Sequence, residues 1–224
     1  MKRVVAIDGP AGSGKSTVAK MVAERLGFTY LDTGAIYRSL AWMALRQGVS
    51  WDDEDSLAGL CSGMRIELRD SRVFVNGADV SGEIRTEEMG RGASQVSAHP
   101  RVREALLELQ RGFCERGGLV AEGRDMGTVV FPDAALKVFL VASPRERAMR
   151  RWKELKGRGV SPLPSLEEIE AMMEERDRQD SKRKTAPLKK APDAMELDTT
   201  ALSVEQVVER VVEWARSRLD TLGI

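Results

Sequence analysis

A glycine-rich segment near the amino terminus has the residue spacing with the most specific chemistry. Residues 9–16 read Gly-Pro-Ala-Gly-Ser-Gly-Lys-Ser, a complete GxxxxGK[ST] motif between a predicted strand and a predicted helix. The glycines let the backbone curl so that consecutive amides point at phosphate oxygens. Lys15 would place a charge on the β and γ phosphates of a nucleoside triphosphate, and the Ser16 hydroxyl would bind Mg²⁺. The residues expected to bind the triphosphate are Gly9, Pro10, Ala11, Gly12, Ser13, Gly14, Lys15, Ser16 and Thr17.

A second polar segment follows the second predicted strand, at residues 31–38. Thr33 is expected to cap a helix that carries Arg38 about one turn in. A helix start beside an arginine suits a phosphomonoester, whereas the plainer interpretation is a capped helix with a surface arginine. Both interpretations stay open at this point.

A third polar segment, residues 119–125, ends an apolar strand in Glu122, a glycine, Arg124 and Asp125. In open α/β sheets, ligands bind at the carboxyl edge of the strands, so these side chains are candidates for a binding site. Glu122 could orient the hydrated Mg²⁺ through a water molecule, or it could pair with Arg124 in a structural role.

The overall composition argues against several classes of protein. Lys and Arg number 35 and Asp and Glu number 35, so no excess of positive charge favours binding to a nucleic acid. No apolar run is long enough to span a bilayer, and the first residues lead straight into a strand, which predicts a cytoplasmic protein without a membrane contact. Cys61 and Cys114 lie far apart and His99 is the one histidine, which argues against a disulfide framework, a His/Cys metal site and histidine catalysis.

Nucleoside triphosphate binding is common to GTPase switches, motor-like ATPases and small-molecule kinases, so further residues must decide the class. The sole asparagine is Asn76, so the guanine-reading NKxD signature is missing and a GTPase switch is disfavoured. A kinase needs a second anion site and arginines that neutralise the transferred phosphoryl group, and this sequence offers both.

Short apolar runs alternate with amphipathic segments along most of the chain. The runs predict five buried parallel strands, at residues 3–7, 28–31, 119–122, 135–141 and 195–197. The segments between them predict helices at residues 15–26, 34–47, 53–61, 100–116, 144–156, 166–184 and 204–219. This alternation is typical of an α/β fold with a doubly wound parallel sheet between layers of helices.

Two stretches depart from that alternation. Between residues 64 and 96 the pattern changes to alternating strands with Asn76 and Gly77 as a turn, which predicts an inserted antiparallel subdomain. The stretch 156–165 is rich in Gly and Pro and joins two charged helices, as a mobile flap or a plain surface loop would. We therefore expect one domain over residues 1–224, with an antiparallel insert near residues 63–100 and a flap or surface loop near residues 152–166.

Several motifs together resemble the bacterial cytidylate kinases, a branch of the nucleoside monophosphate kinases. The resemblance covers essentially the whole chain and rests on residues 9–16, 32–38, 80–85, 93–97, 100–103, 123–128, 175–183 and 186–188. It implies a P-loop fold with a five-stranded parallel sheet, an acceptor-binding insert and a lid. Thr33 stands where the family often has serine, and Glu122 stands where some relatives have aspartate.

The resemblance also implies a role for each matching residue. Arg38, Arg124 and Arg183 would hold the monophosphate of the acceptor, with Thr33 and Tyr37 along its approach. Ser94, Arg103 and Asp125 would read the cytosine ring, which predicts discrimination against uracil because uracil lacks the amino donor. Arg176 and Asp180 would contact the sugar hydroxyls, although their i, i+4 spacing also suits an ordinary ion pair.

The activity implied is direct in-line transfer of the γ-phosphoryl group from ATP, with Mg²⁺, to CMP or dCMP. Lys15, Arg124, Arg183 and Arg151 are the expected catalytic residues, although Arg147, Arg150 and Arg158 also approach the lid. We expect a monomer. Three alternatives stay open: a kinase for another small acceptor such as UMP, dTMP or shikimate, a GTPase-like switch, and a nucleotide-binding module without catalysis.

Overall fold

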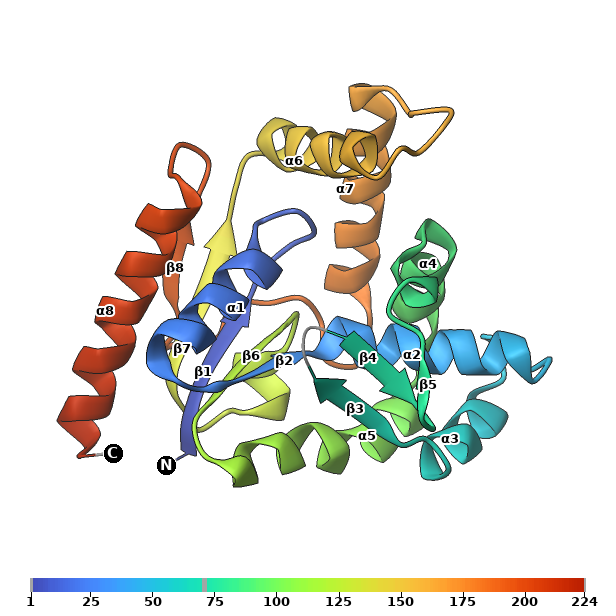
Figure 1. Cartoon of the computed structure of the whole chain (residues 1–224), viewed down its shortest axis with the longest axis horizontal. Coiled ribbons are helices and arrows are strands. Elements are labelled where there is room, and N and C mark those ends of the chain that lie inside the picture. Colours follow the sequence, from blue (N-terminus) through green and yellow to red (C-terminus); the bar gives the residue numbers. More distant parts are fainter. Residues whose placement is uncertain (1, 70–71, 224) are drawn as a thin grey trace. The chain divides into compact units, whose positions relative to one another are not determined.

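The computed structural model describes residues 2–69 and 72–223 and divides into two compact units (Figure 1). The first, here called the sheet unit, comprises Met1–Tyr30 and Arg116–Ile224. The second, here called the helical unit, comprises Leu31–Glu115. All candidate residues of the glycine-rich loop belong to the sheet unit, and the whole acceptor segment, residues 31–38, belongs to the helical unit.

Five strands form the central sheet in the order β2-β6-β1-β7-β8. Their bounds are Lys2–Asp8 for β1, Thr29–Asp32 for β2, Leu119–Gly123 for β6, Ala134–Val141 for β7 and Met195–Asp198 for β8. β1 pairs in parallel with both β6 and β7, so the loops that leave β1 and β6 start side by side at the carboxyl edge. The prediction of an α/β fold with a five-stranded parallel sheet is confirmed.

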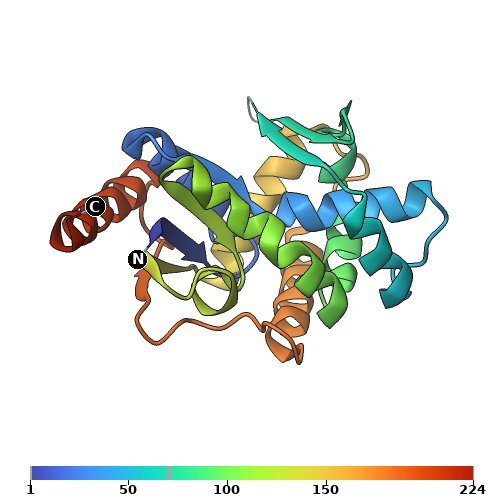
Figure 2. The same ribbon diagram turned by 90° about the horizontal axis from the view of Figure 1, so that it is seen from below.

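Helices α1 (Lys15–Leu26) and α8 (Val204–Leu222) pack against one face of this sheet, where Figure 2 shows them at neighbouring positions. Alternation along β1 directs Val5 and Ile7 into that apolar layer. Asp8 therefore points to the other face, against which the π-helical turn η3 (Met126–Val130) lies. Val4 and Ala6 alternate to the same face as Asp8 and are fully buried, so this polar contact lies within a second apolar layer.

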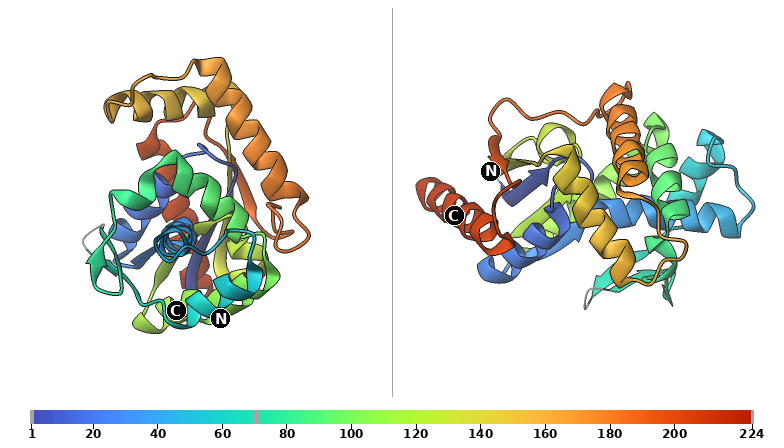
Figure 3. Two further views of the ribbon diagram at one scale, coloured as in Figure 1. Left: turned by 90° about the vertical axis from the view of Figure 1, so that its right-hand side faces the viewer. Right: turned by 90° about the horizontal axis from the view of Figure 1, so that it is seen from above.

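Two further helices of the sheet unit, α6 (Pro144–Gly157) and α7 (Leu166–Lys182), pack against each other (Figure 3). Ser165 begins α7 with a capping box, because its side chain and that of Glu168 each bond the other's backbone amide. Residues 158–165 connect the two helices without regular structure, as the Gly and Pro content of this stretch predicts.

In the part of the chain that is described, the helical unit consists of four α-helices, the short 3₁₀ helix η1, most of a second 3₁₀ helix, η2, and a small antiparallel sheet. Its bounds are Thr33–Arg46 for α2, Glu54–Ser62 for α3, Ile66–Arg69 for β3, Arg72–Val75 for β4, Ala78–Asp79 for β5, Glu83–Arg85 for η1, Glu87–Val96 for α4 and Pro100–Gly112 for α5. The strand order is β3-β4-β5, and residues 113–116 form the 3₁₀ helix η2 that follows α5. The predicted hairpin with its turn at Asn76 and Gly77 is therefore present.

Two sequence predictions about this unit are wrong in part. Residues 87–96 form helix α4 rather than strands, since Thr86 caps it and Gly92 allows close packing: a Cβ there would lie 2.7 Å from Trp51. The helix predicted over residues 100–116 ends at Gly112 and continues as the tighter η2. Within residues 2–69 and 72–223, no helix is long and apolar enough to cross a membrane.

Candidate active site

The glycine-rich loop between β1 and α1 has the curled backbone that the motif predicts. Gly9 has φ 151° and packs so closely on β7 that a Cβ atom would lie 2.2 Å from the Leu140 carbonyl oxygen. Gly14 begins α1 in the left-handed region, with φ 91°. Any side chain at these positions would be strained or would clash, so the loop conformation depends on glycine.

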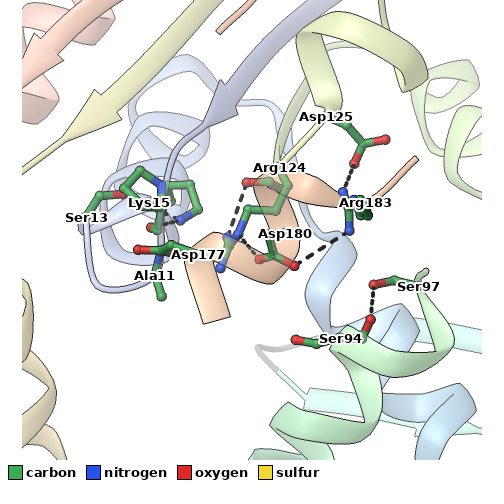
Figure 4. Close-up of polar contacts among 12 residues, drawn as sticks. Ala11, Ser13, Lys15, Ser94, Ser97, Arg124, Asp125, Asp177, Asp180 and Arg183 are labelled. Carbon is green, nitrogen blue, oxygen red and sulfur yellow. Dashed lines mark hydrogen bonds and ion pairs between the residues drawn. The ribbon is translucent and has the colours of Figure 1, made fainter. Parts of the chain in front are cut away.

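Lys15 lies inside this loop and is only 6% exposed. Its Nζ donates to the Pro10 carbonyl oxygen at 2.6 Å and lies 3.5 Å from the Ser13 hydroxyl oxygen (Figure 4). Burial and the charge of Arg124 lower the pKa of Lys15 to about 7, although nearby carboxylates oppose the change. A phosphate group next to this amine would favour its charged form.

Both backbone polar groups of one loop residue, Ala11, are bound by side chains of the helices α6 and α7. The amide of Ala11 donates to Asp177 Oδ1 at 2.9 Å, and the Ala11 carbonyl oxygen accepts from Arg147 Nη1 at 2.9 Å. Arg147 also pairs with Asp177, and both side chains are largely buried. Glycine at position 12 lets α6 pack this closely on the loop, because a Cβ atom there would lie 3.0 Å from the Arg147 carbonyl oxygen and 3.1 Å from Arg147 Cβ.

A cluster of two arginines and two aspartates lies at the carboxyl end of β6, against the end of α7 (Figure 4). Arg124 Nε donates to Asp180 Oδ2 at 2.9 Å, and Arg183 lies 3.8 Å from Asp180 and 3.7 Å from Asp125. Burial opposes the charged form of Asp180, but Arg124, Arg183 and Arg176 together hold its pKa below its usual value. Asp180 therefore bridges the two guanidinium groups.

Two other acidic side chains at this edge of the sheet have defined partners. Glu122 is 4% exposed and accepts from the Tyr30 hydroxyl at 2.5 Å. Asp8 is also 4% exposed and accepts from the amides of Met126 and Gly127, each at 2.8 Å. Burial and the charge of Asp125 raise the pKa of Asp8 to about 6, while the two amides and Lys15 oppose the rise.

The arginines of α6 differ in their contacts. Arg150 donates to the side chain and the carbonyl oxygen of Thr199, after β8, at 3.0 Å and 2.7 Å. Arg151 lies 2.7 Å from Glu154, and Arg158 lies 3.4 Å from the same carboxylate. Arg151 is a quarter exposed, and its expected catalytic role stays a prediction.

In the helical unit, Asp32 rather than Thr33 caps α2, which corrects the sequence prediction. Asp32 has extended backbone angles, and its Oδ1 accepts from the Ala35 amide at 2.9 Å. Its other carboxylate oxygen accepts from Arg38 at 2.8 Å. Asp and Thr both cap helices well, so residue type alone does not show whether Asp32 or Thr33 is the N-cap; the observed start of the helix does. Thr33 is the first helical residue and is buried.

Three of the expected base-reading and substrate-lining residues of the helical unit lie on one chain of contacts. Arg103 lies over the Tyr37 ring, 5.4 Å from its centre, and donates to the Ser97 carbonyl oxygen at 3.2 Å. The Ser97 hydroxyl donates to the Ser94 carbonyl oxygen at 3.1 Å, as Figure 4 shows. Ser94 Oγ in turn donates to the Gly90 carbonyl oxygen at 3.3 Å. Arg103 and Tyr37 are both more than nine-tenths buried.

Sequence reasoning did not assign Asp8, Tyr30 or Asp177. Asp8 had a signal, because it is a charged residue at the end of the apolar run 4–7 and directly precedes the loop. Asp177 and Tyr30 stand in segments whose partners lie far away along the chain, at Ala11 and Glu122. Spacing alone does not reveal such contacts.

Comparison with known proteins identifies the relatives of this chain. The family model for cytidylate kinase matches residues 5–217. The chain belongs to the cytidylate kinase family. A cytidylate kinase of Chromobacterium violaceum is 53% identical over 211 residues, covering 94% of each chain.

Two other cytidylate kinases show the same level of similarity. The one from Geobacter sp. strain M21 is 51% identical and the alignment covers 96% of this chain and 94% of the relative. The one from Geobacillus sp. strain WCH70 is 50% identical, with 96% and 97% covered. This family member is therefore a kinase with a P-loop fold.

Proposed function

We propose that the chain transfers the γ-phosphoryl group of ATP to CMP or dCMP, which gives ADP and CDP or dCDP. Its membership of the cytidylate kinase family, over residues 5–217, carries this proposal. The curled loop around Lys15 and the arginine cluster after β6 support it, because a kinase needs one site for each phosphate-bearing substrate.

In the proposed reaction, an oxygen of the CMP 5′-phosphate forms a bond to the γ-phosphorus of ATP. The bond from that phosphorus to the oxygen bridging the β and γ phosphates breaks, and ADP leaves. The phosphate of CMP is already a nucleophile near neutral pH, so no protein base is needed. The proposed reaction assigns no step to His99, the one histidine, whose Nε2 lies 2.8 Å from the Trp51 carbonyl oxygen.

Positioning and charge neutralisation then supply the catalysis. The loop amides and Lys15 bind the β and γ phosphates. Arg38, Arg124 and Arg183 bind the phosphate of CMP, and Arg151 neutralises charge on the transferred group. Asp180 fixes the guanidinium groups of Arg124 and Arg183 within reach of a phosphate, since it pairs with both.

Selection of the base falls to Asp125, Ser94 and Arg103. Asp125 and Ser94 accept from the amino group of cytosine, and Arg103 donates to its ring oxygen and nitrogen. Uracil presents an acceptor where cytosine presents that donor, so a buried carboxylate at this point disfavours UMP. Asp125 is 2% exposed, which makes the penalty for a wrong base large. Arg176 and Asp180 contact the sugar, with Thr33 and Tyr37 beside the phosphate.

The chemistry of the donor groups fits a magnesium ion that arrives with the nucleotide. Among residues 2–69 and 72–223, no group of three or more His, Cys, Asp or Glu side chains gathers to hold a metal ion. Mg²⁺ prefers oxygen donors and is commonly held by one or two protein groups together with phosphates and water. The Ser16 hydroxyl would bind it and Glu122 would act through water. When bound, the ion neutralises charge on the β and γ phosphates.

A panel of acceptors tests the proposal directly. ADP formation would be followed with ATP and CMP, dCMP, UMP, dTMP or shikimate, and with GTP as the alternative donor. CMP and dCMP should give kcat/KM values well above those of the other acceptors, and their ratio establishes which is preferred. Binding of ATP with no CMP-dependent ADP release would point to a non-catalytic module. A monomeric state and a cytoplasmic location stay predictions, the first of which sedimentation can test.

A further inference from the structure

Asp8 joins two loops of the site that are far apart in the sequence. It is the last residue of β1 and directly precedes Gly9, the first residue of the glycine-rich loop. Its two carboxylate oxygens accept from the amides of Met126 and Gly127, the first two residues of η3. These residues directly follow Arg124 and Asp125, so Asp8 fastens the turn after β6 to the end of β1.

This contact replaces a more common arrangement. An aspartate at the N-cap of a helix usually accepts hydrogen bonds from the first amides of that helix. Asp125 stands at the N-cap of η3, but its side chain makes no capping hydrogen bond, because Asp8 takes the amides of Met126 and Gly127. The Asp125 carboxylate instead lies 3.7 Å from Arg183. Asp8 thus makes the capping hydrogen bonds that the N-cap residue Asp125 does not make.

The same turn is fixed on its other side by β7. A Cβ atom on Gly127 would lie 3.1 Å from Lys137 Cδ and 3.2 Å from its Cγ, so the backbone of the turn rests on this stem. Lys137 is 9% exposed, and its Nζ pairs with Asp193 at 2.9 Å. The turn is therefore held between a carboxylate and an aliphatic stem.

The burial of Asp8 indicates that its two hydrogen bonds to the turn have a function. A carboxyl group that is 4% exposed and has a second acid nearby is costly to keep charged, and its pKa is raised to about 6. A neutral residue could cap a turn without that cost. An acid that can accept from two amides at once is needed only where both hydrogen bonds must hold.

We propose that Asp8 is a positioning residue for base selection, which holds the turn so that the Asp125 carboxylate faces the amino group of cytosine. This inference rests on the proposed function, in which Asp125 reads the base. Asp8 acts through Asp125 and the backbone and does not touch the substrate.

The test compares Asp8→Asn, Asp125→Asn and the double variant in kcat/KM for CMP and for UMP. Asn at position 8 keeps one acceptor oxygen but presents an NH₂ group to the second amide. We expect Asp8→Asn to narrow the CMP-to-UMP ratio about tenfold, with less than a twofold change in the KM for ATP. In the double variant the ratio should equal that of Asp125→Asn alone, because Asp8 acts on the ratio only through Asp125.

A structural role alone would lower kcat for both acceptors equally and leave the ratio unchanged, and that outcome would overturn the inference. If Asp125→Asn itself leaves the ratio unchanged, base reading by Asp125 fails, whatever Asp8→Asn does. Asp53→Asn is the matched control, since Asp53 also caps a helix start, but in α3 and at the surface.

A second variant keeps the test decisive if Asp8→Asn does not fold. Gly127→Ala places a Cβ atom 3.1 Å from Lys137 Cδ, so it crowds the same turn against Lys137 without replacing Asp8, and a crystal structure of the variant shows whether the turn has moved. It should also narrow the CMP-to-UMP ratio. A folded Gly127→Ala protein with the original ratio would count against a turn whose position sets selectivity.

Discussion

The two units place their arginines by different means. In the sheet unit, buried carboxylates hold them: Asp180 pairs with Arg124 and Arg183, and Asp177 pairs with Arg147. In the helical unit, Arg38 pairs with the acid that caps its own helix, and Arg103 lies over an aromatic ring and donates to a carbonyl oxygen. The first arrangement depends on buried ion pairs, in which one acid, Asp180, serves two arginines. The second depends on one more exposed ion pair and on contacts that involve no acid. Loss of one acid should therefore do more damage in the sheet unit.

The strongest test of the sheet unit is the loop lysine. Lys15→Ala should lower kcat about 10³-fold, because a preorganised charge beside the transferred phosphate is lost. CMP binding, followed by calorimetry, should change little. Lys20→Ala is the control, since Lys20 is exposed on the same helix α1. A near-normal rate for Lys15→Ala would contradict its role.

The next largest effect is expected when Asp180, the acid that pairs with two arginines, is replaced. Asp180→Asn should lower the free energy of unfolding by about 3 kcal/mol, because Arg124 and Arg183 stay buried with their main charge partner removed. Denaturant titration measures this. Glu175→Gln, at a half-exposed position of the same helix, should leave the transition midpoint unchanged. If both substitutions change the free energy of unfolding equally little, the sheet unit does not depend on its buried acids in the way described above.

Base selection should show an intermediate effect. Asp125→Asn should narrow the CMP-to-UMP ratio in kcat/KM by about tenfold to a hundredfold, since an amide can donate to the uracil oxygen that a carboxylate repels. Steady-state assays of both acceptors give this ratio. If it stays as in the unaltered chain, Asp125 does not read the base.

In the helical unit, the expected effect of replacing Asp32 is smaller. Two variants separate its role as the cap of α2 from the role of its charge beside Arg38. Asp32→Ala should lower the free energy of unfolding by about 1 kcal/mol, because the cap of α2 is lost. Asp32→Asn keeps a good cap but removes the charge beside Arg38, so it should raise the KM for CMP with little loss of stability. Equal destabilisation by both variants would show that the charge, and not the cap, is what α2 requires.

The smallest expected effect is the uptake of less than one proton for each ATP molecule bound. Burial lowers the pKa of Lys15 to about 7, so at pH 8 much of this amine is neutral. Phosphate charges raise that pKa, so ATP binding at pH 8 should take up protons, and affinity should rise as the pH falls from 9 towards 7. Calorimetry in two buffers of different ionisation enthalpy measures the uptake. Lys15→Ala should abolish it, and identical heats in both buffers would exclude it.

The features that the sequence predicts are those set by local spacing. The loop motif lies within eight residues, and the apolar runs of the parallel strands are continuous, so both could be recognised without distant contacts. Helix α4 was missed because its two glycines, Gly90 and Gly92, weaken the local preference for a helix, which packing against Trp51 overrides.

The contacts made by Asp8 and Asp177 could not be predicted for a different reason. Asp8 meets Met126 from 118 positions away, and Asp177 meets Ala11 from 166 positions away. Many pairings at such separations are compatible with the same sequence pattern, and only the order of strands and helices selects one. The identity of candidate residues is thus easier to predict than the partners that hold them.

The binding of both backbone polar groups of Ala11 has a mechanical consequence. Both the amide and the carbonyl group at Ala11 are bound by side chains of the two neighbouring helices. With glycine at position 12, the helices touch the backbone itself. A displacement of α7 would therefore move the backbone of the loop that is proposed to bind the phosphates of ATP. Movement of this helix would thus change the affinity of the loop for those phosphates.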